Sequence, residues 1–435
     1  MTLSRSGMLF LSVFMLIVIE GALRKWVSNS LSLPLILLRD LLALWLVFHA
    51  WRNGCLRLRN KVVAALFFWS LLVMAWGLVQ IVGGQSSPVI LIIGLRFWLL
   101  YTWFAVAAAY SMNEADYRFA IFTIGWTMLL MAPLAVVQHF APPGTFINAQ
   151  TEGDEEGVFQ VVAGVVRTTG TFSFTSGFAF FMTLAAPMVF GVLSARKRNL
   201  KQYLFAIALL VAFFVGALVS GSRTAVVSSG AMFGAYLLGR LMFSKMRDKP
   251  VAFAAVVVAL VLLAVFAFFF QDAILATQTR FEQASEAEDF WGRVVVIFFG
   301  EPGVYDQLDF LGHGFGYGSN LANFVRTGAT ADGVFALAEA EPGRIMLEGG
   351  MLGMVYILFK FVAIALGLWK AFRISTRTNS PFPALVWLTV ALAWITWTSV
   401  GQLTANGLLG VVLALGLLVF RYPRLEIFQS RAAKT

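Results

Sequence analysis

Six arginines are set apart from the other basic residues of the chain by where they fall. Most Lys and Arg residues lie in short loops between apolar segments, but these six lie at or near the opposite ends of such segments or in the loops there: Arg39, Arg96, Arg167, Arg223, Arg293 and Arg344. A guanidinium group makes paired hydrogen bonds to phosphate oxygens, and it is costly to hold at an apolar boundary. The pattern predicts a site for a phosphorylated lipid at one face of a membrane.

Arg223 differs from the others because its neighbours are small. It lies in Ser-Gly-Ser-Arg-Thr-Ala at 220–225, a turn that joins two apolar segments. Small side chains let backbones approach closely and leave the guanidinium group free to point into a cavity. The alternative is that Arg223 only extends toward the lipid headgroups.

The composition indicates the broad class of protein. Of 435 residues, 60% are hydrophobic and 12% are charged, the mean hydropathy is +0.82, and apolar runs of about 20 residues recur along the chain. We therefore expect an all-α polytopic membrane protein, with residues 1–435 forming one integral-membrane domain. The net charge of +10 is explained by basic cytoplasmic loops and does not indicate a nucleic-acid partner. The single cysteine, Cys55, excludes an intrachain disulfide and metal sites built from clustered thiolates.

Hydropathy predicts about twelve transmembrane helices. The expected spans are residues 7–27, 33–51, 62–83, 89–112, 117–138, 174–195, 203–220, 225–243, 251–270, 345–369, 383–402 and 407–420. Charged residues close the first segment where a signal peptide would have its cleavage site, so we expect a retained helix. The clusters of Lys and Arg then all fall on one side of the membrane, which places both termini in the cytoplasm.

Two long loops are expected on the opposite, outer side, at about 139–172 and 271–343. The larger loop lies between the ninth and tenth helices, and residues 273–299 within it are expected to form a partly amphipathic helix. Residues 312–318, Gly-His-Gly-Phe-Gly-Tyr-Gly, predict a tight loop whose backbone approaches another element closely. Their spacing is not that of a dinucleotide fingerprint. A loop of this length is typically functional.

Several ionisable residues fall inside the predicted spans: Glu20, Arg24, Lys25, Arg39, Asp40, Arg96 and Lys360. An unpaired charge at this depth costs at least about 2.5–3.5 kcal/mol. Structural pairs between helices are the favoured explanation for the residues of the first two spans, and Glu20 and Arg24 are one helical turn apart. Arg96 has no acid near it in the sequence. For Arg96, a position in the lining of a ligand cavity is therefore as well supported as a structural ion pair.

Several stretches, in order along the chain, resemble the O-antigen ligase/polymerase family of bacterial envelopes. They are Glu-Gly-Ala-Leu-Arg-Lys-Trp at 20–26 with Leu-Arg-Asp at 38–40, Val-Arg-Thr-Thr-Gly-Thr-Phe at 166–172, the turn at 220–225, Trp-Gly-Arg at 291–293, the glycine run at 312–318, and Glu-Gly-Gly-Met-Leu-Gly at 348–353. The first pair looks like a polymerase-like subgroup. Each motif is short, but the ordered set covers essentially the whole chain.

The resemblance implies a glycosyltransferase whose donor is an undecaprenyl-diphosphate-linked glycan. Such proteins work in the bilayer of the bacterial inner membrane, at its periplasmic face, without an obligatory metal or other cofactor. By position, Arg223 and Arg293 would hold the diphosphate, with Arg167 and Arg344 as further candidates; Arg96 joins them because of its depth. A flippase and a chain-length regulator would be possible partners.

This chain departs from the ligases of that family at one position. The ligases carry a histidine about nine residues ahead of the Glu-Gly helix start, where this chain has Glu339. The departure favours a polymerase, with Glu339 or Glu341 as the general base for the acceptor hydroxyl. Both could instead be ordinary loop acids that favour the next helix N-terminus. His313, flanked by Gly314 in a substrate loop that also includes Gly316, is the alternative base.

The expected function is therefore polymerisation of lipid-diphosphate-linked repeat units of a bacterial O-antigen or exopolysaccharide. The nearest alternative is an O-antigen ligase that transfers glycan to lipid A core or to protein. A lipid-linked oligosaccharide flippase is the alternative from another class. The two halves of the chain show no visible duplication, which counts against a transporter.

Overall fold

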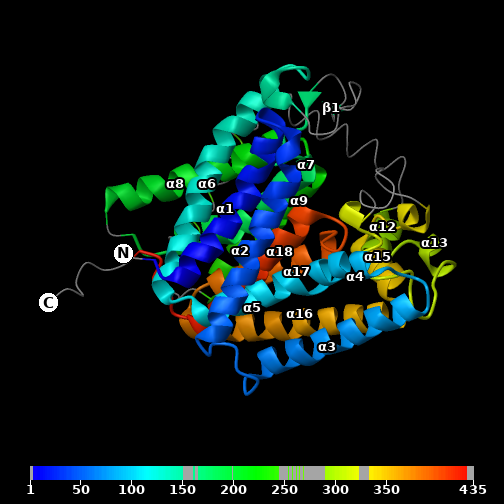
Figure 1. The fold of residues 1–435 in the computed structure, drawn as a ribbon. Helices are drawn as coiled ribbons and strands as arrows, with labels where there is room; N and C mark the ends of the chain where they lie inside the picture. The colour runs from blue at the N-terminus through cyan, green and yellow to red at the C-terminus, as the bar shows by residue number, and fades with distance from the viewer. Residues whose placement is uncertain are drawn as a thin grey trace.

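The computed structural model describes residues 3–149, 160–161, 165–197, 199–243, 290–322 and 333–428, with five single helical positions between 253 and 268. Within these residues the protein is almost entirely helical (Figure 1). The strands β1 (Gln160–Val161) and β2 (Val165–Val166) form one short antiparallel pair. Ten of the described helices are long and apolar enough to cross a membrane. The chain thus folds as an all-α, multi-pass membrane protein.

The long apolar helices include one composite helix. They are α1 (Arg5–Trp26), α2 (Ser32–Arg52), α3 (Lys61–Val82), the composite of α4 (Pro88–Leu95), the π-helical turn η2 (Arg96–Leu100) and α5 (Tyr101–Ser111), then α6 (Glu114–Phe140), α7 (Thr175–Ser194), α8 (Leu200–Val219), α9 (Arg223–Phe243), α16 (Met351–Thr378) and α18 (Leu403–Arg421). The shorter elements are η1 (Asn29–Leu31), η3 (Phe146–Asn148), α12 (Phe290–Phe299), α13 (Pro302–Tyr305), η6 (Gly333–Leu337), α15 (Glu341–Gly349) and α17 (Phe382–Thr396).

Most of the predicted spans correspond to a helix of the structure. The span predicted at 251–270 lies outside the described residues, apart from five single helical positions. The span predicted at 383–402 corresponds to α17, which has only 15 residues. Of the amphipathic helix predicted at 273–299, the described part is α12; residues 273–289 lie outside the described residues.

The span predicted at 345–369 is divided, and this part of the prediction was wrong. The helix α15 ends at Gly349, Gly350 has a φ of 54°, and α16 begins at Met351. A side chain at Gly350 would meet the backbone of Phe310, so the break allows two segments to approach closely. The apolar run begins at Met351, and Arg344, Glu348 and the glycine pair at 349–350 precede it, so the predicted start of the span lay about six residues too early.

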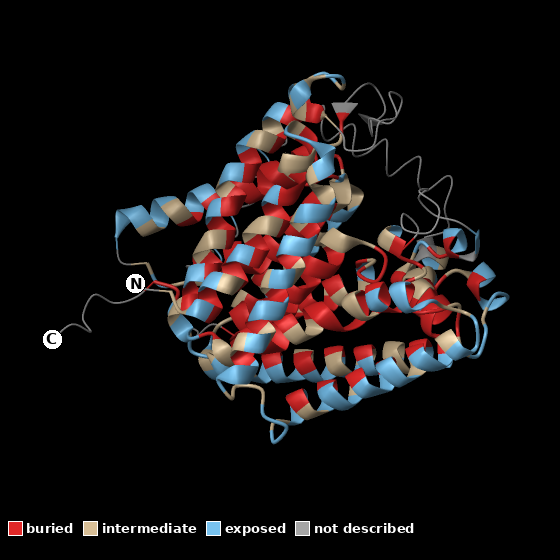
Figure 2. Cartoon of the chain, in the orientation of Figure 1, coloured by how far each residue is buried: buried red, intermediate tan, exposed pale blue. Residues whose placement is uncertain are grey.

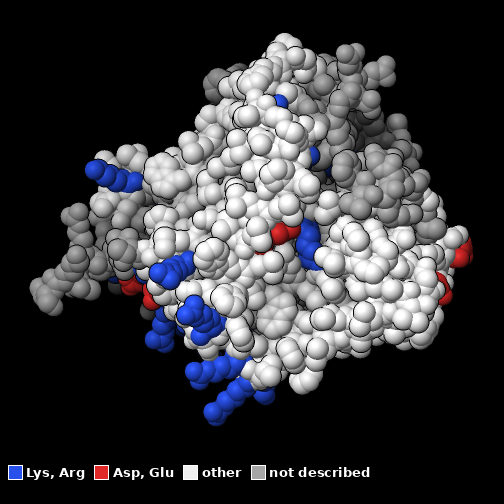
Figure 3. All heavy atoms as spheres, viewed as in Figure 1, with Lys and Arg blue, Asp and Glu red and all other residues white. Residues whose placement is uncertain are grey.

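Hydrogen bonds bring the two ends of the described chain to the same end of the bundle. Ser4 caps α1 and donates from Oγ to Asp116 Oδ2 at 2.6 Å, and Asp116 is also part of the capping box that starts α6. Arg118 Nε donates to the carbonyl of Glu426, just after α18, at 2.8 Å. Lys and Arg gather on this side of the molecule in Figure 3. We call it the basic end.

Burial separates the central helices from the peripheral ones. Nearly every residue of α7 and most of α18 are buried, whereas α2, α3 and α16 expose large apolar side chains along most of their length (Figure 2). Apolar side chains exposed over whole helices are what the hydrocarbon of a bilayer would cover. The peripheral position of α2 matters for the site, because α2 carries two of its charged residues.

Candidate functional site

An arginine–acid network joins the outer half of α1 to α2 and η2. Its members are Glu20, Arg24, Arg39, Asp40 and Arg96, with Tyr101 beside them. Arg39 Nη1 donates to Glu20 Oε2 at 2.7 Å, and Arg96 donates to both oxygens of Asp40, from Nε at 2.6 Å and from Nη2 at 3.1 Å. Tyr101 Oη donates to Asp40 Oδ1 at 2.8 Å. The pairs lock three helical segments together, which confirms the predicted pairing for Glu20, Arg24, Arg39 and Asp40. Lys25 instead donates to a hydroxyl and a backbone carbonyl.

Within the described residues, the network has more guanidinium groups than carboxylates. Arg24 Nη1 lies 3.9 Å from Glu20 Oε1, so three guanidinium groups lie around two carboxylates. Three buried nitrogens, Nε and Nη2 of Arg39 and Nη1 of Arg96, have no hydrogen-bond partner among the described residues. The Arg39 side chain is 0% exposed and that of Arg96 is 9% exposed. Buried donors without an acceptor are costly, and an anion placed beside them would satisfy both their charge and their hydrogen bonds.

Figure 3 shows charged atoms of both signs side by side near the middle of the face, apart from the basic side chains at its lower left. Arg39 lies seven residues after the start of α2, or roughly 10 Å along the helix axis. It lies 13 residues, or roughly 20 Å, from Arg52 at the basic end. The network is therefore in the half of the bundle away from the basic loops.

The loop that carries Arg167 is fixed to α1 beside the network. Lys25 Nζ donates to Thr169 Oγ1 at 2.7 Å and to the carbonyl of Gly170 at 2.8 Å. Thr171 Oγ1 donates to the carbonyl of Val18 at 2.5 Å. Arg167 itself is half-buried at the end of β2. These contacts connect the Arg167 loop to α1, the helix that carries Glu20. The sequence alone did not predict them.

A second polar cluster, the α15 cluster, surrounds the break between α15 and α16. Glu341 Oε1 accepts a hydrogen bond from Ser399 Oγ at 2.5 Å, and Oε2 accepts one from the backbone N–H of Val400 at 3.2 Å. Lys360 Nζ, on α16, lies 4.0 Å from Glu341 Oε1. All three side chains are buried. The lysine predicted to lie in the middle of a span is therefore paired with one of the two predicted base candidates.

Glu348, at the end of α15, binds two segments at once. Its Oε2 accepts from Trp98 Nε1 at 2.7 Å, and its Oε1 accepts from the backbone N–H of Gly318 at 2.9 Å. Arg344 donates to the carbonyls of Ala338 at 2.8 Å and Gly318 at 2.6 Å, so its guanidinium group holds loop backbone. Glu348, Trp98 and Ser399 were not among the site residues predicted from the sequence. Two signals in the sequence pointed to Glu348: it is an acid beside a long apolar run, and it begins the motif at 348–353.

Burial sets the ionisation of the two α15 carboxyls. Burial raises the pKa of Glu348 to about 7, although the hydrogen bonds from Trp98 and the glycine backbone oppose the shift. Burial also raises the pKa of Glu341, and the charge of Lys360 opposes it. A carboxyl with a raised pKa holds or accepts a proton nearer neutral pH than an ordinary glutamate does.

The raised pKa of Glu348 predicts that stability falls between about pH 4.5 and pH 7. Over this range the unfolded chain loses the proton while the folded chain keeps it, so the stabilisation present below pH 4.5 is lost as the pH rises through the folded value. The loss is of order 3 kcal/mol at most. Melting temperatures in detergent across pH 4.5–8 should fall less steeply for Glu348→Gln, whose amide oxygen still accepts from Trp98. An identical slope in both proteins would contradict the assignment.

The glycine run at 312–318 forms the expected close backbone contact. Gly316 has a φ of 89°, and a Cβ there would lie 2.6 Å from the N atom of Gly94 and 2.7 Å from the carbonyl O of Ile90, both on α4. His313 is half-buried; its Nε2 lies 2.9 Å from the carbonyl of Gln307, and its ring packs against Phe335. In this arrangement His313 and the glycine run fasten a loop to α4 and α15.

Gly316→Ala is expected to lower the free energy of unfolding by about 3 kcal/mol or more, because strain at positive φ adds to a backbone collision. Gly84 is a matched control: its φ is 78°, and a Cβ there would have no atom within 4 Å. Gly84→Ala should therefore cost only about 1–2 kcal/mol. Thermal unfolding of the two purified variants measures the difference. Equal losses would show that the contact with α4 adds nothing.

The remaining predicted residues are not joined to these clusters by the described contacts. Glu339 is exposed just ahead of α15. Arg223 is half-buried at the first position of α9, after the turn at 220–222. Arg293 lies in α12, and its side chain is outside what the structure describes. The expected meeting of Arg223 and Arg293 in one pocket thus stays a prediction.

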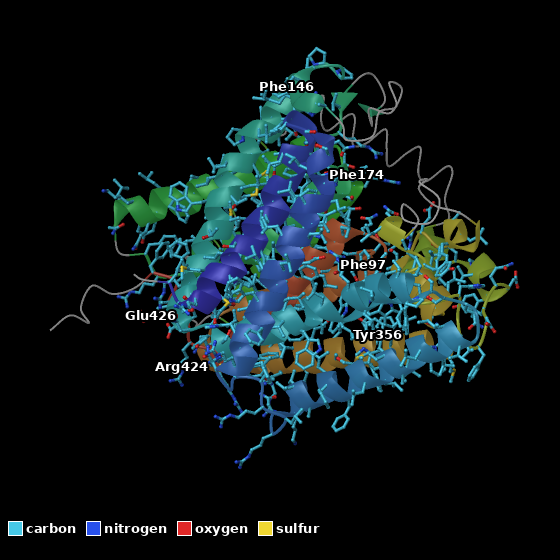
Figure 4. All side chains as sticks on the ribbon, in the orientation of Figure 1. Phe97, Phe146, Phe174, Tyr356, Arg424 and Glu426 are labelled. Atoms are coloured by element: carbon cyan, nitrogen blue, oxygen red, sulfur yellow. The ribbon has the colours of Figure 1, made fainter. Side chains whose placement is uncertain are left out.

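The turn η2 places the two polar clusters next to each other. Arg96 belongs to the arginine–acid network, and Trp98 belongs to the α15 cluster. A cavity of about 10 Å³, the space of one water molecule, lies between them and is lined by residues that include Phe97, Tyr101, Ser399 and Tyr356. Phe97 and Tyr356 mark its position near the centre of Figure 4. The arginine–acid network and the buried carboxyl group of Glu348 therefore both contact this one helical turn.

Comparison with known proteins adds no family to this geometry. The sequence matches no model of a protein family, and no curated protein shows significant similarity to it.

Proposed function

We propose that the protein is a glycosyltransferase of the bacterial inner membrane that polymerises lipid-linked saccharide repeat units at the periplasmic face. Its donor would be an undecaprenyl-diphosphate-linked glycan. The observation that carries the proposal is the arginine–acid network, in which buried N–H donors of Arg39 and Arg96 lack acceptors among the described residues. A diphosphate at the bilayer boundary supplies the negative charge and the acceptor oxygens that such a network needs.

The reaction requires stabilisation of a leaving group. The acceptor hydroxyl oxygen bonds to the anomeric carbon of the donor, and the bond from that carbon to the phosphate oxygen breaks. The electron pair of the broken bond leaves with the diphosphate. Fixed guanidinium groups in a low-dielectric site stabilise this growing charge without having to reorganise. In this proposal Arg96 and Arg39 serve that purpose in the bundle, and Arg223, Arg293, Arg167 and Arg344 are the candidates from the loops and helix ends.

The proton of the acceptor hydroxyl needs a base. Glu341 is the better-placed of the two candidates within the protein, because Ser399, the Val400 N–H and Lys360 hold its carboxyl group in one position. A raised pKa makes it a stronger base than an exposed glutamate. Glu339, which is exposed, is the candidate that the glycan of a lipid-linked acceptor could reach directly.

Glu341→Gln is expected to slow chain extension by about 10²–10⁴-fold if Glu341 is the base, while Glu339→Gln retains activity. The measurement is the glycan ladder of a deletion strain complemented with each variant, at equal amounts of protein in the membrane. Full activity of both variants would remove these glutamates from the mechanism. The reverse result would assign the role to Glu339.

The deletion strain itself separates the proposed function from its rivals. Loss of a polymerase leaves product with a single repeat unit, whereas loss of a ligase leaves polymer on the lipid carrier. Loss of a flippase leaves the lipid-linked unit on the cytoplasmic side of the membrane. Normal polymer in the deletion strain would overturn the proposal.

A further inference from the structure

A cavity of about 510 Å³ lies among α3, α5, α16, α17 and α18. Its inner end, at Thr102 and Leu413, also borders the small cavity beside η2. Its walls are mainly apolar, and they include Val62 and Leu66 of α3, Ala105 of α5, Ala363 of α16 and Leu413 of α18. This volume is within the range of sites for small molecules and lipids. The cavity is therefore large enough for a ligand rather than for a few water molecules.

The attachment of α3 explains why the cavity is there. Near its end, α3 is fixed by Gln80 Nε2 and Trp76 Nε1, which both donate to the carbonyl of Leu311, at 2.6 and 3.0 Å. At its middle, Trp69 stacks on Tyr356 of α16, with ring centroids 5.5 Å apart. Toward the start of α3, Val62 and Leu66 border the cavity. The first turns of α3 thus form a wall with space behind it.

Two cations lie at one end of the apolar cavity, and this end is the basic end of the bundle. Lys370 Nζ lies 4.2 Å from the ring centroid of Phe420, and Arg421, the next residue, donates from Nη1 to the carbonyl of Ala109 at 3.0 Å. Lys370 and Arg421 are both exposed, and both line the cavity. The described residues that line the cavity include no Asp or Glu. Apolar walls with cations at the rim match an acyl chain joined to an anionic headgroup.

We propose that this cavity binds an anionic phospholipid of the bilayer, with an acyl chain between α3 and α18 and the phosphate at Lys370 and Arg421. The phosphate end of the site is distinct from the site of the proposed donor, because Arg421 lies 11 residues, or roughly 16 Å, along α18 from Gly410, which contacts Tyr101 beside the network. The proposal does not rest on the proposed glycosyltransferase activity. In this proposal, the basic residues at this end of the molecule bind a lipid headgroup in addition to orienting the protein in the membrane.

The test is lipid retention by the purified full-length protein, measured by native mass spectrometry. The protein in detergent is offered equal amounts of phosphatidylglycerol and phosphatidylcholine. We expect the parent to retain phosphatidylglycerol in preference. The double variant K370Q/R421Q should lose about tenfold in phosphatidylglycerol retention, with little change for phosphatidylcholine. Ala363→Phe, which fills the apolar part, should lower the retention of both lipids.

The double variant R52Q/R424Q is the matched control, because these two exposed residues remove the same charge from the basic end without lining the cavity. Arg424 is labelled in Figure 4. An equal loss in the control would show general attraction to a basic surface and overturn the site. Unchanged lipid retention in both K370Q/R421Q and Ala363→Phe would also overturn the site. Displacement of the phospholipid by a polyprenyl diphosphate would overturn it as well. If K370Q/R421Q fails to fold, the exposed single variant K370Q carries the same test.

Discussion

Arg39→Ala is expected to lower the free energy of unfolding by about 3–5 kcal/mol. Arg39 is 0% exposed, and its 2.7 Å bond to Glu20 is the shortest ion pair of that carboxylate. Removing the guanidinium group leaves Glu20 buried without its main partner and leaves a gap between α1 and α2. The measurement is the thermal unfolding of the purified protein in detergent. Arg52→Ala, at the exposed end of the same helix, should change stability by less than about 0.5 kcal/mol.

A double variant separates the cost of a broken pair from the value of an intact one. Glu20→Gln/Arg39→Gln removes both charges of this pair together, so neither of them is left buried without the other. It should be more stable than Arg39→Ala, because most of the loss in the single variant is the penalty of an orphaned carboxylate. If the two variants were equally destabilised, packing rather than charge would hold α1 to α2.

Arg96→Gln is expected to reduce chain extension by about 100-fold or more, on the basis of the proposed function. Removal of one donor that stabilises a developing negative charge typically has an effect of this size. Arg96 is more exposed than Arg39, at 9% against 0%. It also has a buried nitrogen without a hydrogen-bond partner among the described residues. The glycan ladder of the complemented deletion strain gives the activity, and immunoblotting of membranes gives the amount of protein.

The pairing of Arg96 with Asp40 allows a sharper control. If Arg96 only neutralises Asp40, then Asp40→Asn/Arg96→Gln should restore both stability and activity, because neither charge remains. If Arg96 binds the diphosphate, the double variant should recover stability yet stay inactive. Recovery of chain extension in the double variant would therefore remove Arg96 from the proposed site.

The sequence was sufficient to predict features that depend on local composition. Apolar runs located the helices, and the pairing of Glu20 with Arg24 followed from their spacing of one helical turn. The glycine run predicted a close backbone contact, and Gly316 against Gly94 confirms it. These features depend on residues that are near one another in the chain.

Features that depend on the packing of distant helices were not predictable. Asp40 and Arg96 are 56 residues apart, and Glu341 and Ser399 are 58 residues apart. Which acid meets which arginine depends on the rotation of each helix about its axis, and hydropathy does not fix that rotation when both faces are apolar.

The π-helical turn has a consequence for how this protein can change over evolution. A π turn holds one more residue than an α turn, so it rotates the segment that follows by about 100°. Before the turn, Gly94 lies against Phe315; after it, Tyr101 lies against Gly410 of α18. Loss or gain of a single residue between these two contacts would turn one away from its partner. In homologous chains the length of this segment should therefore stay constant even where its residue types vary.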